Sequence, residues 1–176
     1  MSQYSPFYDF DVVMENLRDL EKGNIKPFEK NEYQQQLLSF LHNISDYHNR
    51  ISLEVVEAYL SEIATRETVV EVVPQKVYYE VLQSGNDSVS TLDSNFKMHL
   101  IESRVLEGEE VVIKDTRTAN KPIAIVLSDT ILGFAKGASG MICGERRKIY
   151  IHPDLAYGKY GSTGFQQIMI YDVERL

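Results

Sequence analysis

The spacing of the apolar residues changes once along the chain, near residue 68. Before that point apolar side chains recur every three or four residues, which is the period of one helix face. After it they alternate with polar residues or form short β-branched runs bounded by turn residues, which is typical of strands. A chain of 176 residues with this division fits one standard domain preceded by a smaller helical part.

The first part predicts a small all-α domain over residues 1–68 that contains three amphipathic helices. The predicted helices cover residues 10–20, 33–44 and 52–63. Gly23 is placed to end the first helix, the polar turn residues near Asn43–Asp46 to end the second, and Ser52 to cap the third. So small a helical unit buries little core by itself, and we expect it to pack on the rest of the chain, on a second copy or on another protein.

The second part, residues 69–176, predicts strands that follow one another with a single interruption. The predicted strands cover residues 69–73, 77–82, 96–100, 110–113, 123–127, 147–151 and 168–173. One short helix is predicted from Asp129, as its N-cap, to about Gly137. Consecutive strands with one short helix favour an antiparallel α+β domain over a wound parallel sheet.

Composition and motifs exclude several classes of function. The net charge of −8, without a basic stripe, argues against nucleic-acid binding. Four dispersed histidines and one cysteine, Cys143, predict no metal site, and the glycines after residue 132 form no nucleotide-binding motif, so we expect no cofactor. The start of the chain lacks a signal-peptide pattern and no apolar run is long enough to cross a membrane, which predicts a cytoplasmic protein.

Five ordered blocks in the second part carry a more specific signal. They are residues 121–127 (KPIAIVL), 130–134 (TILGF), 141–147 (MICGERR), 151–158 (IHPDLAYG) and 170–174 (IYDVE). In this order they resemble the signature of FKBP-type peptidyl-prolyl cis-trans isomerases, and residues 74–82 are similar to the segment that opens that domain. The helices before it resemble, in architecture, the helical dimerisation region of Mip-like members.

The resemblance implies a twisted antiparallel sheet wrapped around one short helix, with an apolar pocket for proline between them. It also implies a rotamase that assists protein folding, with proline-containing polypeptides as clients, a homodimer formed through the N-terminal helices, and a pocket that macrolide inhibitors can enter. The chemistry needs no acid, base or metal, because rotation about an X-Pro bond requires only a dry site that favours the twisted amide.

The family pattern, carried over residue by residue, assigns a pocket to this chain. Phe134 stands where the family has a tryptophan floor, and Ile131 beside it offers its backbone N–H to the substrate carbonyl. Tyr157 offers its hydroxyl to the peptide, and Tyr171 stands where the family has phenylalanine. The remaining positions are substrate-contacting wall or cover residues: Ile113, Ile123, Ile125, Thr130 and Phe165.

Departures from the pattern predict a reduced rate. Residues 98–103 lack the family's pocket tyrosine and the glycine that follows it, Lys114 stands where an acidic pocket residue is usual, and the loop after Tyr157 lacks the usual Ile-Pro-Pro. Two alternatives therefore stay open. The domain is a catalytically idle chaperone or binding module, or residues 1–68 bind a partner and the sheet domain only stabilises them.

Overall fold

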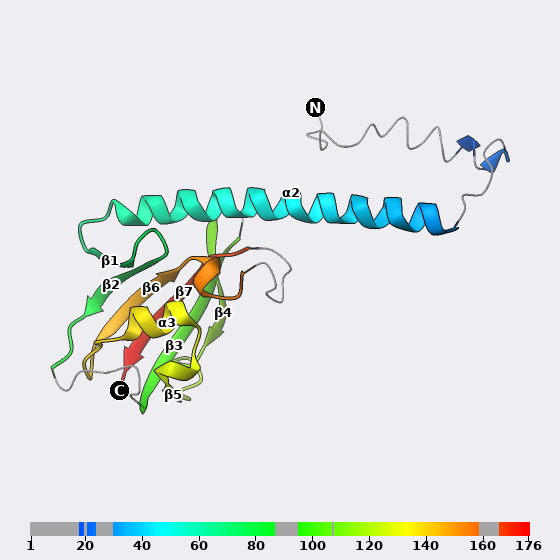
Figure 1. Cartoon of the computed structure of the whole chain (residues 1–176). Helices are drawn as coiled ribbons and strands as arrows, with labels where there is room; N and C mark the ends of the chain where they lie inside the picture. Colours follow the sequence, from blue (N-terminus) through cyan, green and yellow to red (C-terminus); the bar gives the residue numbers. More distant parts are fainter. Residues whose placement is uncertain (1–17, 20, 24–29, 87–94, 107, 159–165) are drawn as a thin grey trace. The chain divides into compact units, whose positions relative to one another are not determined.

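The computed structural model describes residues 18–19, 21–23, 30–86, 95–106, 108–158 and 166–176. By its internal contacts the chain divides into two units, Met1–Ser45 and Asp46–Leu176, and the second unit contains the sheet. The elements in chain order are α2 (Lys30–Ala64), β1 (Val69–Val73), β2 (Val77–Gln83), β3 (Asn95–Leu106), β4 (Glu109–Asp115), β5 (Ile123–Val126), η1 (Leu127–Asp129), α3 (Leu132–Ala138), β6 (Arg146–Ile151), η2 (Pro153–Leu155) and β7 (Met169–Arg175) (Figure 1).

All strand pairs of the sheet are antiparallel, as the sequence predicts. The strand order is β1-β2-β6-β7-β3-β4, and β5 pairs with β3 as well. Strand β3 is long enough to hold two partners on one side: residues 95–98 pair with β5, and residues 101–106 pair with β4. Its other side pairs with β7. The start of β3 and β5 thereby form one wall beside α3.

Side chains from both faces of the sheet pack in hydrophobic clusters within the second unit, since neighbouring strand residues point to opposite sides. On β6, Ile149 and Ile151 pack in the cluster that includes Phe134 of α3, whereas Tyr150 packs in a second cluster. That second cluster contains the α2 residues Val56, Leu60 and Ile63 together with Tyr78 of β2, Ile170 of β7 and Ile168, which directly precedes β7. The part of α2 from Asp46 onward therefore covers the face that α3 leaves open.

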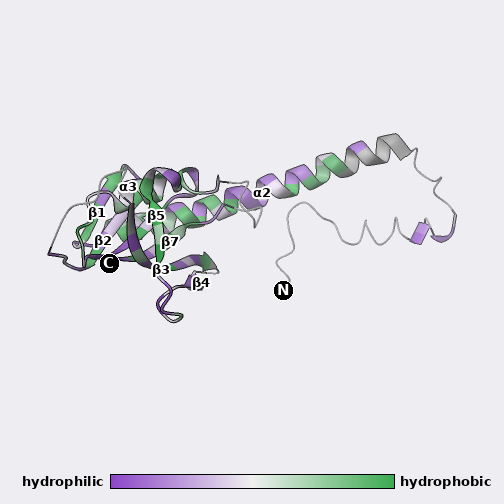
Figure 2. Ribbon diagram, turned by 90° about the horizontal axis from the view of Figure 1, so that it is seen from below, coloured by the Kyte–Doolittle hydropathy of each residue, from purple (hydrophilic) through white to green (hydrophobic). Residues whose placement is uncertain are grey.

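The prediction of separate second and third helices is wrong, because residues 30–64 form the single helix α2. Asn, Ser and Asp at positions 43–46 each cost less than about 1 kcal/mol in a helix. No Gly or Pro occurs between Pro27 and Pro74 to stop the helix. Polar and apolar segments alternate along α2 (Figure 2), and no helix of the described residues is long and apolar enough to cross a membrane.

The predicted helix over residues 10–20 lies almost entirely outside the described residues. Arg18 and Asp19 are helical, and the backbone N–H of Lys22 donates to the carbonyl of Arg18 at 3.0 Å. Gly23 follows with a φ of 72°. This left-handed conformation is the one that a glycine after a helix end adopts.

Asp129 does not cap the short helix as predicted. It is the last residue of η1, and α3 begins only at Leu132, with Ile131 as an N-cap that makes no side-chain cap bond. Thr130 and Ile131 have extended ψ angles of 172° and 144°, so they separate the two helical turns. This extended pair matters for the site, because it leaves Ile131 at the mouth of the pocket described next.

Candidate active site

A pocket of about 390 Å³ opens between β3, β5, the start of α3 and β7. Its lining residues are Met98, Leu100, Glu102, Ile123, Ile125, Asp129, Thr130, Ile131, Phe134, Tyr157 and Tyr171. The structure thus brings together every site residue that the sequence predicts except Ile113 and Phe165. The lining residues come from segments as far apart in the chain as Met98 and Tyr171, and the sheet order β7-β3-β5 places these segments side by side.

Phe134 forms the buried base of this pocket, with 3% of its surface exposed. Its ring meets the ring of Tyr171 edge to face, with centroids 5.1 Å apart and an interplanar angle of 79°. Helix α3 holds Phe134 against the sheet through Ala135 and Ala138, which are buried in the same cluster. The base is therefore aromatic and fixed by packing on both sides.

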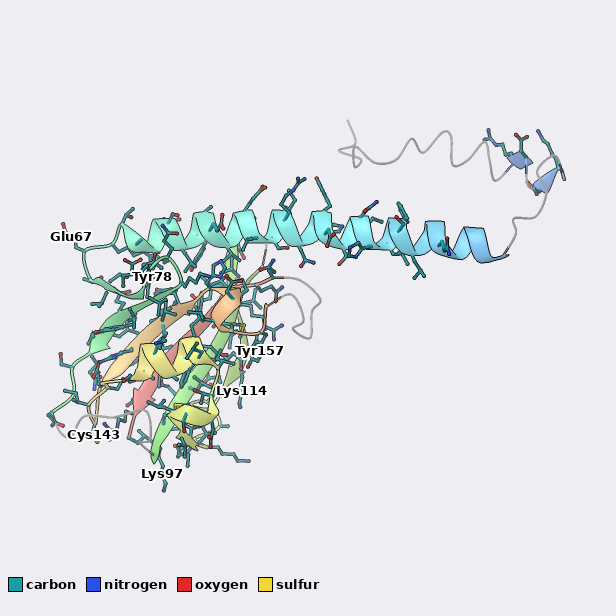
Figure 3. The ribbon with its side chains drawn as sticks, in the orientation of Figure 1. Glu67, Tyr78, Lys97, Lys114, Cys143 and Tyr157 are labelled. Atoms are coloured by element: carbon teal, nitrogen blue, oxygen red, sulfur yellow. The ribbon has the colours of Figure 1, made fainter. Side chains whose placement is uncertain are left out.

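Two tyrosine hydroxyls meet in the pocket. Tyr171 is buried on β7, whereas Tyr157 is half-exposed. Tyr157 follows η2 and is labelled in Figure 3. Burial, followed by the hydrogen bond with the hydroxyl of Tyr157, raises the pKa of Tyr171, so the phenol stays protonated in the physiological range. The hydroxyl of half-exposed Tyr157, which bonds the buried phenol of Tyr171, is positioned to hydrogen-bond a bound peptide as well.

Ile131 offers a free backbone donor at the edge of the pocket. Its carbonyl accepts from the N–H of Ala135 at 3.0 Å, but its own N–H donates to no group among the described residues. The hydroxyl of neighbouring Thr130 is already used, because it donates to the carbonyl of Leu127 at 2.7 Å. The Ile131 N–H is therefore the main-chain donor available to a ligand carbonyl there.

Strand β3 supplies pocket residues that motif comparison alone did not assign. Met98, Leu100 and Glu102 alternate along the strand and so share the pocket face. Leu100 is fixed in place by Thr116, whose hydroxyl accepts from the Leu100 N–H at 2.7 Å. The alternation of Met98, His99 and Leu100 is the available signal for this wall, and it does not extend to Glu102. Asp129 was expected only as a helix cap, and it lies at the rim.

Ile113 does not line the pocket, which corrects the sequence assignment. The pairing of β3 with β4 shifts between Glu102, which faces Lys114, and Ser103, which faces Val112. Ile113 is the extra residue of this bulge and is 49% exposed. Lys114 is exposed as well and is not a lining residue. Phe165 lies outside the described residues.

The pocket offers shape and hydrogen-bonding groups to a ligand. Among the described residues no group of three or more His, Cys, Asp or Glu side chains could hold a metal ion. The site offers an aromatic base, aliphatic walls, one free backbone N–H and one open hydroxyl, a combination that suits a small apolar ring attached to a carbonyl.

Comparison with known proteins agrees with this arrangement. The profile of the family described as FKBP-type peptidyl-prolyl cis-trans isomerase matches residues 86–176, more than half of the chain. The chain therefore belongs to the FKBP-type peptidyl-prolyl cis-trans isomerase family.

Among individual relatives, the peptidyl-prolyl cis-trans isomerase Mip of Chlamydia muridarum is 32% identical over 169 residues, covering 94% of this chain and 67% of that protein. The Mip of Chlamydia pneumoniae is 29% identical over 167 residues, and the chain spans only 64% of its length. The crystal structure of FkpA from Escherichia coli has the same fold, with a TM-score of 0.65 at 22% identity over 96% of this chain and 81% of that one.

Proposed function

We propose that the protein is a peptidyl-prolyl cis-trans isomerase that assists protein folding, and that the pocket around Phe134 is its active site. The observation that carries the proposal is the meeting of an aromatic base, the free Ile131 N–H and the Tyr157 hydroxyl in one apolar pocket. Family membership and the names of the Mip relatives support it.

The proposed mechanism follows from the X-Pro bond. Rotation about it crosses a barrier of roughly 20 kcal/mol because the planar amide is stabilised by resonance. In the twisted state that resonance is lost, and the group becomes less polar than either planar isomer. An apolar pocket that seats the proline ring on Phe134 favours the twisted state, while the Ile131 N–H and Tyr157 hydroxyl hold the flanking carbonyls.

The rate is proposed to be lower than is usual for the family. Leu100 lies on the pocket wall without a hydroxyl, in the strand where the family carries a tyrosine, and Lys114, which stands where an acidic pocket residue is usual, does not line the pocket. Macrolide binding to the same pocket and a cytoplasmic location stay predictions, which an inhibitor titration and cell fractionation would test.

A protease-coupled assay on a proline tetrapeptide tests the proposal. We expect wild-type turnover to fall more than tenfold in Phe134→Ala, which removes the base, and about three- to tenfold in Tyr157→Phe, which removes one hydrogen bond. Tyr59→Phe, a tyrosine on α2 away from the pocket, is the matched control and should keep full activity. Turnover that survives in both pocket variants would reject this site.

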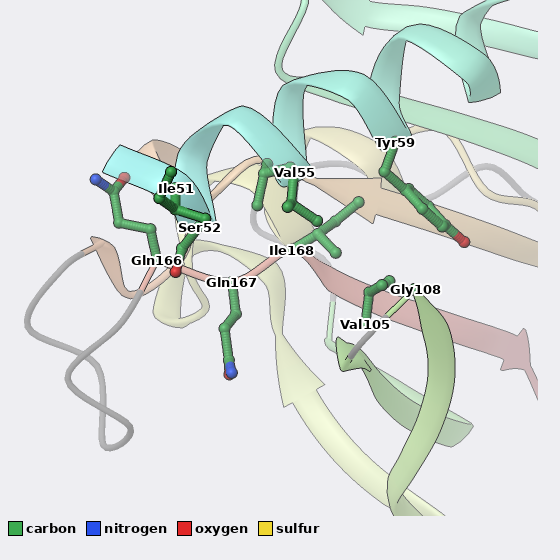
Figure 4. Close-up of a pocket in the computed structure, with 10 residues that line it drawn as sticks. Ile51, Ser52, Val55, Tyr59, Val105, Gly108, Gln166, Gln167 and Ile168 are labelled. Atoms are coloured by element: carbon green, nitrogen blue, oxygen red, sulfur yellow. The ribbon is translucent and has the colours of Figure 1, made fainter. Parts of the chain in front are cut away.

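One observation favours the alternative of a chaperone or binding module. An apolar groove of about 460 Å³ lies between α2 and the sheet within the second unit, lined by Ile51, Val55, Tyr59, Val105 and Ile168, with Gln166 and Gln167 at its side (Figure 4). Ile51 and Val55 are 40% and 49% exposed. Suppressed aggregation of an unfolded client without any isomerisation would select this alternative.

A homodimer through the N-terminal helices is part of the proposal. In the first unit, Leu38 and Leu41 on α2 are 66% and 51% exposed, which is apolar surface that a second copy could cover. Light scattering should report about twice the chain mass of 20.2 kDa. A monomer at high concentration would contradict the dimer without affecting the proposed active site.

A further inference from the structure

Glu102 is an unexpected residue for a pocket of this kind. It extends from β3 into a site whose other β3 residues, Met98 and Leu100, are apolar, and it is half-buried. Among the described residues its side chain forms no ion pair or hydrogen bond, whereas acidic residues elsewhere in the unit, such as Asp154, Asp172 and Glu145, are paired. The carboxylate is thus a charge available to a ligand.

Two cations lie on neighbouring strand positions, and among the described residues neither forms an ion pair with Glu102. Arg104 follows on the same strand, where alternate residues lie about 7 Å apart, and its guanidinium donates to the side chain of Gln167 at 3.5 Å. Lys114 is the cross-strand partner of Glu102, but it is exposed and forms no ion pair with it. Among the described residues that line the pocket none is basic, and the carboxylic acids there are Glu102 and Asp129.

A peptide that enters the pocket removes water from this carboxylate. Desolvating an unpaired charge is unfavourable unless the ligand supplies a partner for it. A lysine or arginine next to the proline supplies such a partner, whereas a glutamate adds repulsion. The remaining walls are apolar and distinguish peptides by shape. Selection between basic and acidic residues next to the proline therefore depends on the carboxylate of Glu102.

We propose that Glu102 makes the pocket select X-Pro segments that carry lysine or arginine next to the proline. This inference rests on the proposed isomerase function, and it adds a substrate class to it. Glu102 is a specificity-determining residue here, since the rotation itself needs no carboxylate.

Two peptide series test the inference by cis–trans exchange NMR, one varying the residue before proline and one the residue after it, each with Lys, Leu or Glu. In at least one series we expect kcat/KM to be roughly tenfold higher for Lys than for Glu, with Leu between them, and the ratio to shrink at high salt. Glu102→Gln should reduce the ratio to about twofold or less. Glu109→Gln, which removes an exposed charge at the far end of the β3–β4 hairpin, should leave it unchanged.

Equal rates for all wild-type peptides, or a preference that persists in Glu102→Gln, would overturn the inference and leave the isomerase proposal standing. If no peptide is isomerised at all, the proposed function fails instead. In that case chemical-shift titrations with the same peptides still measure binding: tighter binding of the Lys peptides, abolished by Glu102→Gln, supports the charge selection, and equal binding overturns it.

Discussion

At the scale of single residues, Gly137 sets how closely α3 approaches the sheet. A Cβ built at this position would overlap the Cγ2 of Ile149, which is fully buried on β6. The glycine is therefore needed for close packing rather than for a special backbone angle. The depth of the pocket base depends on this contact, because Phe134 lies one turn earlier on the same helix.

Gly137→Ala is expected to lower the free energy of unfolding by about 1–3 kcal/mol, because overpacking at Ile149 outweighs the helix propensity of alanine. Propensity alone predicts the opposite sign, a gain of up to about 1 kcal/mol. Urea unfolding measures the difference, with Lys136→Ala on the exposed side of α3 as the control, expected within about 0.5 kcal/mol of wild type. A variant as stable as wild type would contradict the packing argument.

Most pocket residues could be predicted from the sequence because they lie within short ordered blocks, such as 130–134 and 156–158. Three features could not. The bulge that turns Ile113 outward depends on the pairing register of two strands, which no local pattern encodes. The hydrogen bond between the side chains of Tyr157 and Tyr171 joins two separate segments of the chain, so no local pattern predicts it. Glu102 differs from its apolar neighbours on the strand, so it gave no signal of a pocket face.

At the scale of elements, the strands were easier to predict than the helices. Each predicted strand from residue 69 onward corresponds to an observed one, because alternation and turn residues mark both ends. The sequence pattern predicts two helices in place of α2, because Asn43, Ser45 and Asp46 are residues typical of a turn. The continuation of α2 is a property of the whole segment: no residue from 30 to 64 stops the helix, and its later part packs on the sheet.

The short helix η2 contains a pH-dependent cap. The Nδ1 of buried His152 accepts a hydrogen bond from the N–H of Asp154 at 3.1 Å, which requires an unprotonated Nδ1. Burial lowers the pKa of His152 below 6.5. The negative charge of Asp154 acts in the opposite direction, as does the more weakly acting Glu57, whereas the positive charge of Lys76 lowers the pKa further. The unfolded chain therefore binds a proton at His152 more readily than the folded one.

The stability that follows from keeping His152 neutral in the folded chain is fully present above pH 6.5. It is lost as the pH falls from 6.5 toward the lowered pKa of His152. We expect the free energy of unfolding to decrease between pH 7.5 and 5.5, by at most about 1.4 kcal/mol per pH unit from this one site. His152→Asn keeps a cap acceptor without the titration and should show a shallower decrease. Asp154 and Asp172, whose pKa values are lowered below 3.8, do not titrate in this window. An equally steep decrease in the variant would contradict the assignment.

At the scale of the whole molecule, the sheet separates two surfaces with different properties. One face carries the pocket around Phe134, and the other packs against α2 from Asp46 onward and borders the apolar groove. The boundary of 1–68 and 69–176 proposed from the sequence stays a prediction. Because Val56, Leu60 and Ile63 are buried against the sheet, residues of α2 contribute to the core of the unit that holds the site.

Cis–trans exchange of a proline peptide, observed by NMR with the full chain at catalytic concentration, tests the central claim most directly because it needs no coupling protease. Uncatalysed exchange takes roughly 10–100 s at 25 °C. The wild-type protein is predicted to accelerate it at least tenfold, and Phe134→Ala to return it close to the uncatalysed rate. Exchange that is not accelerated, or that is accelerated equally by Phe134→Ala, would contradict the assignment of catalysis to this pocket.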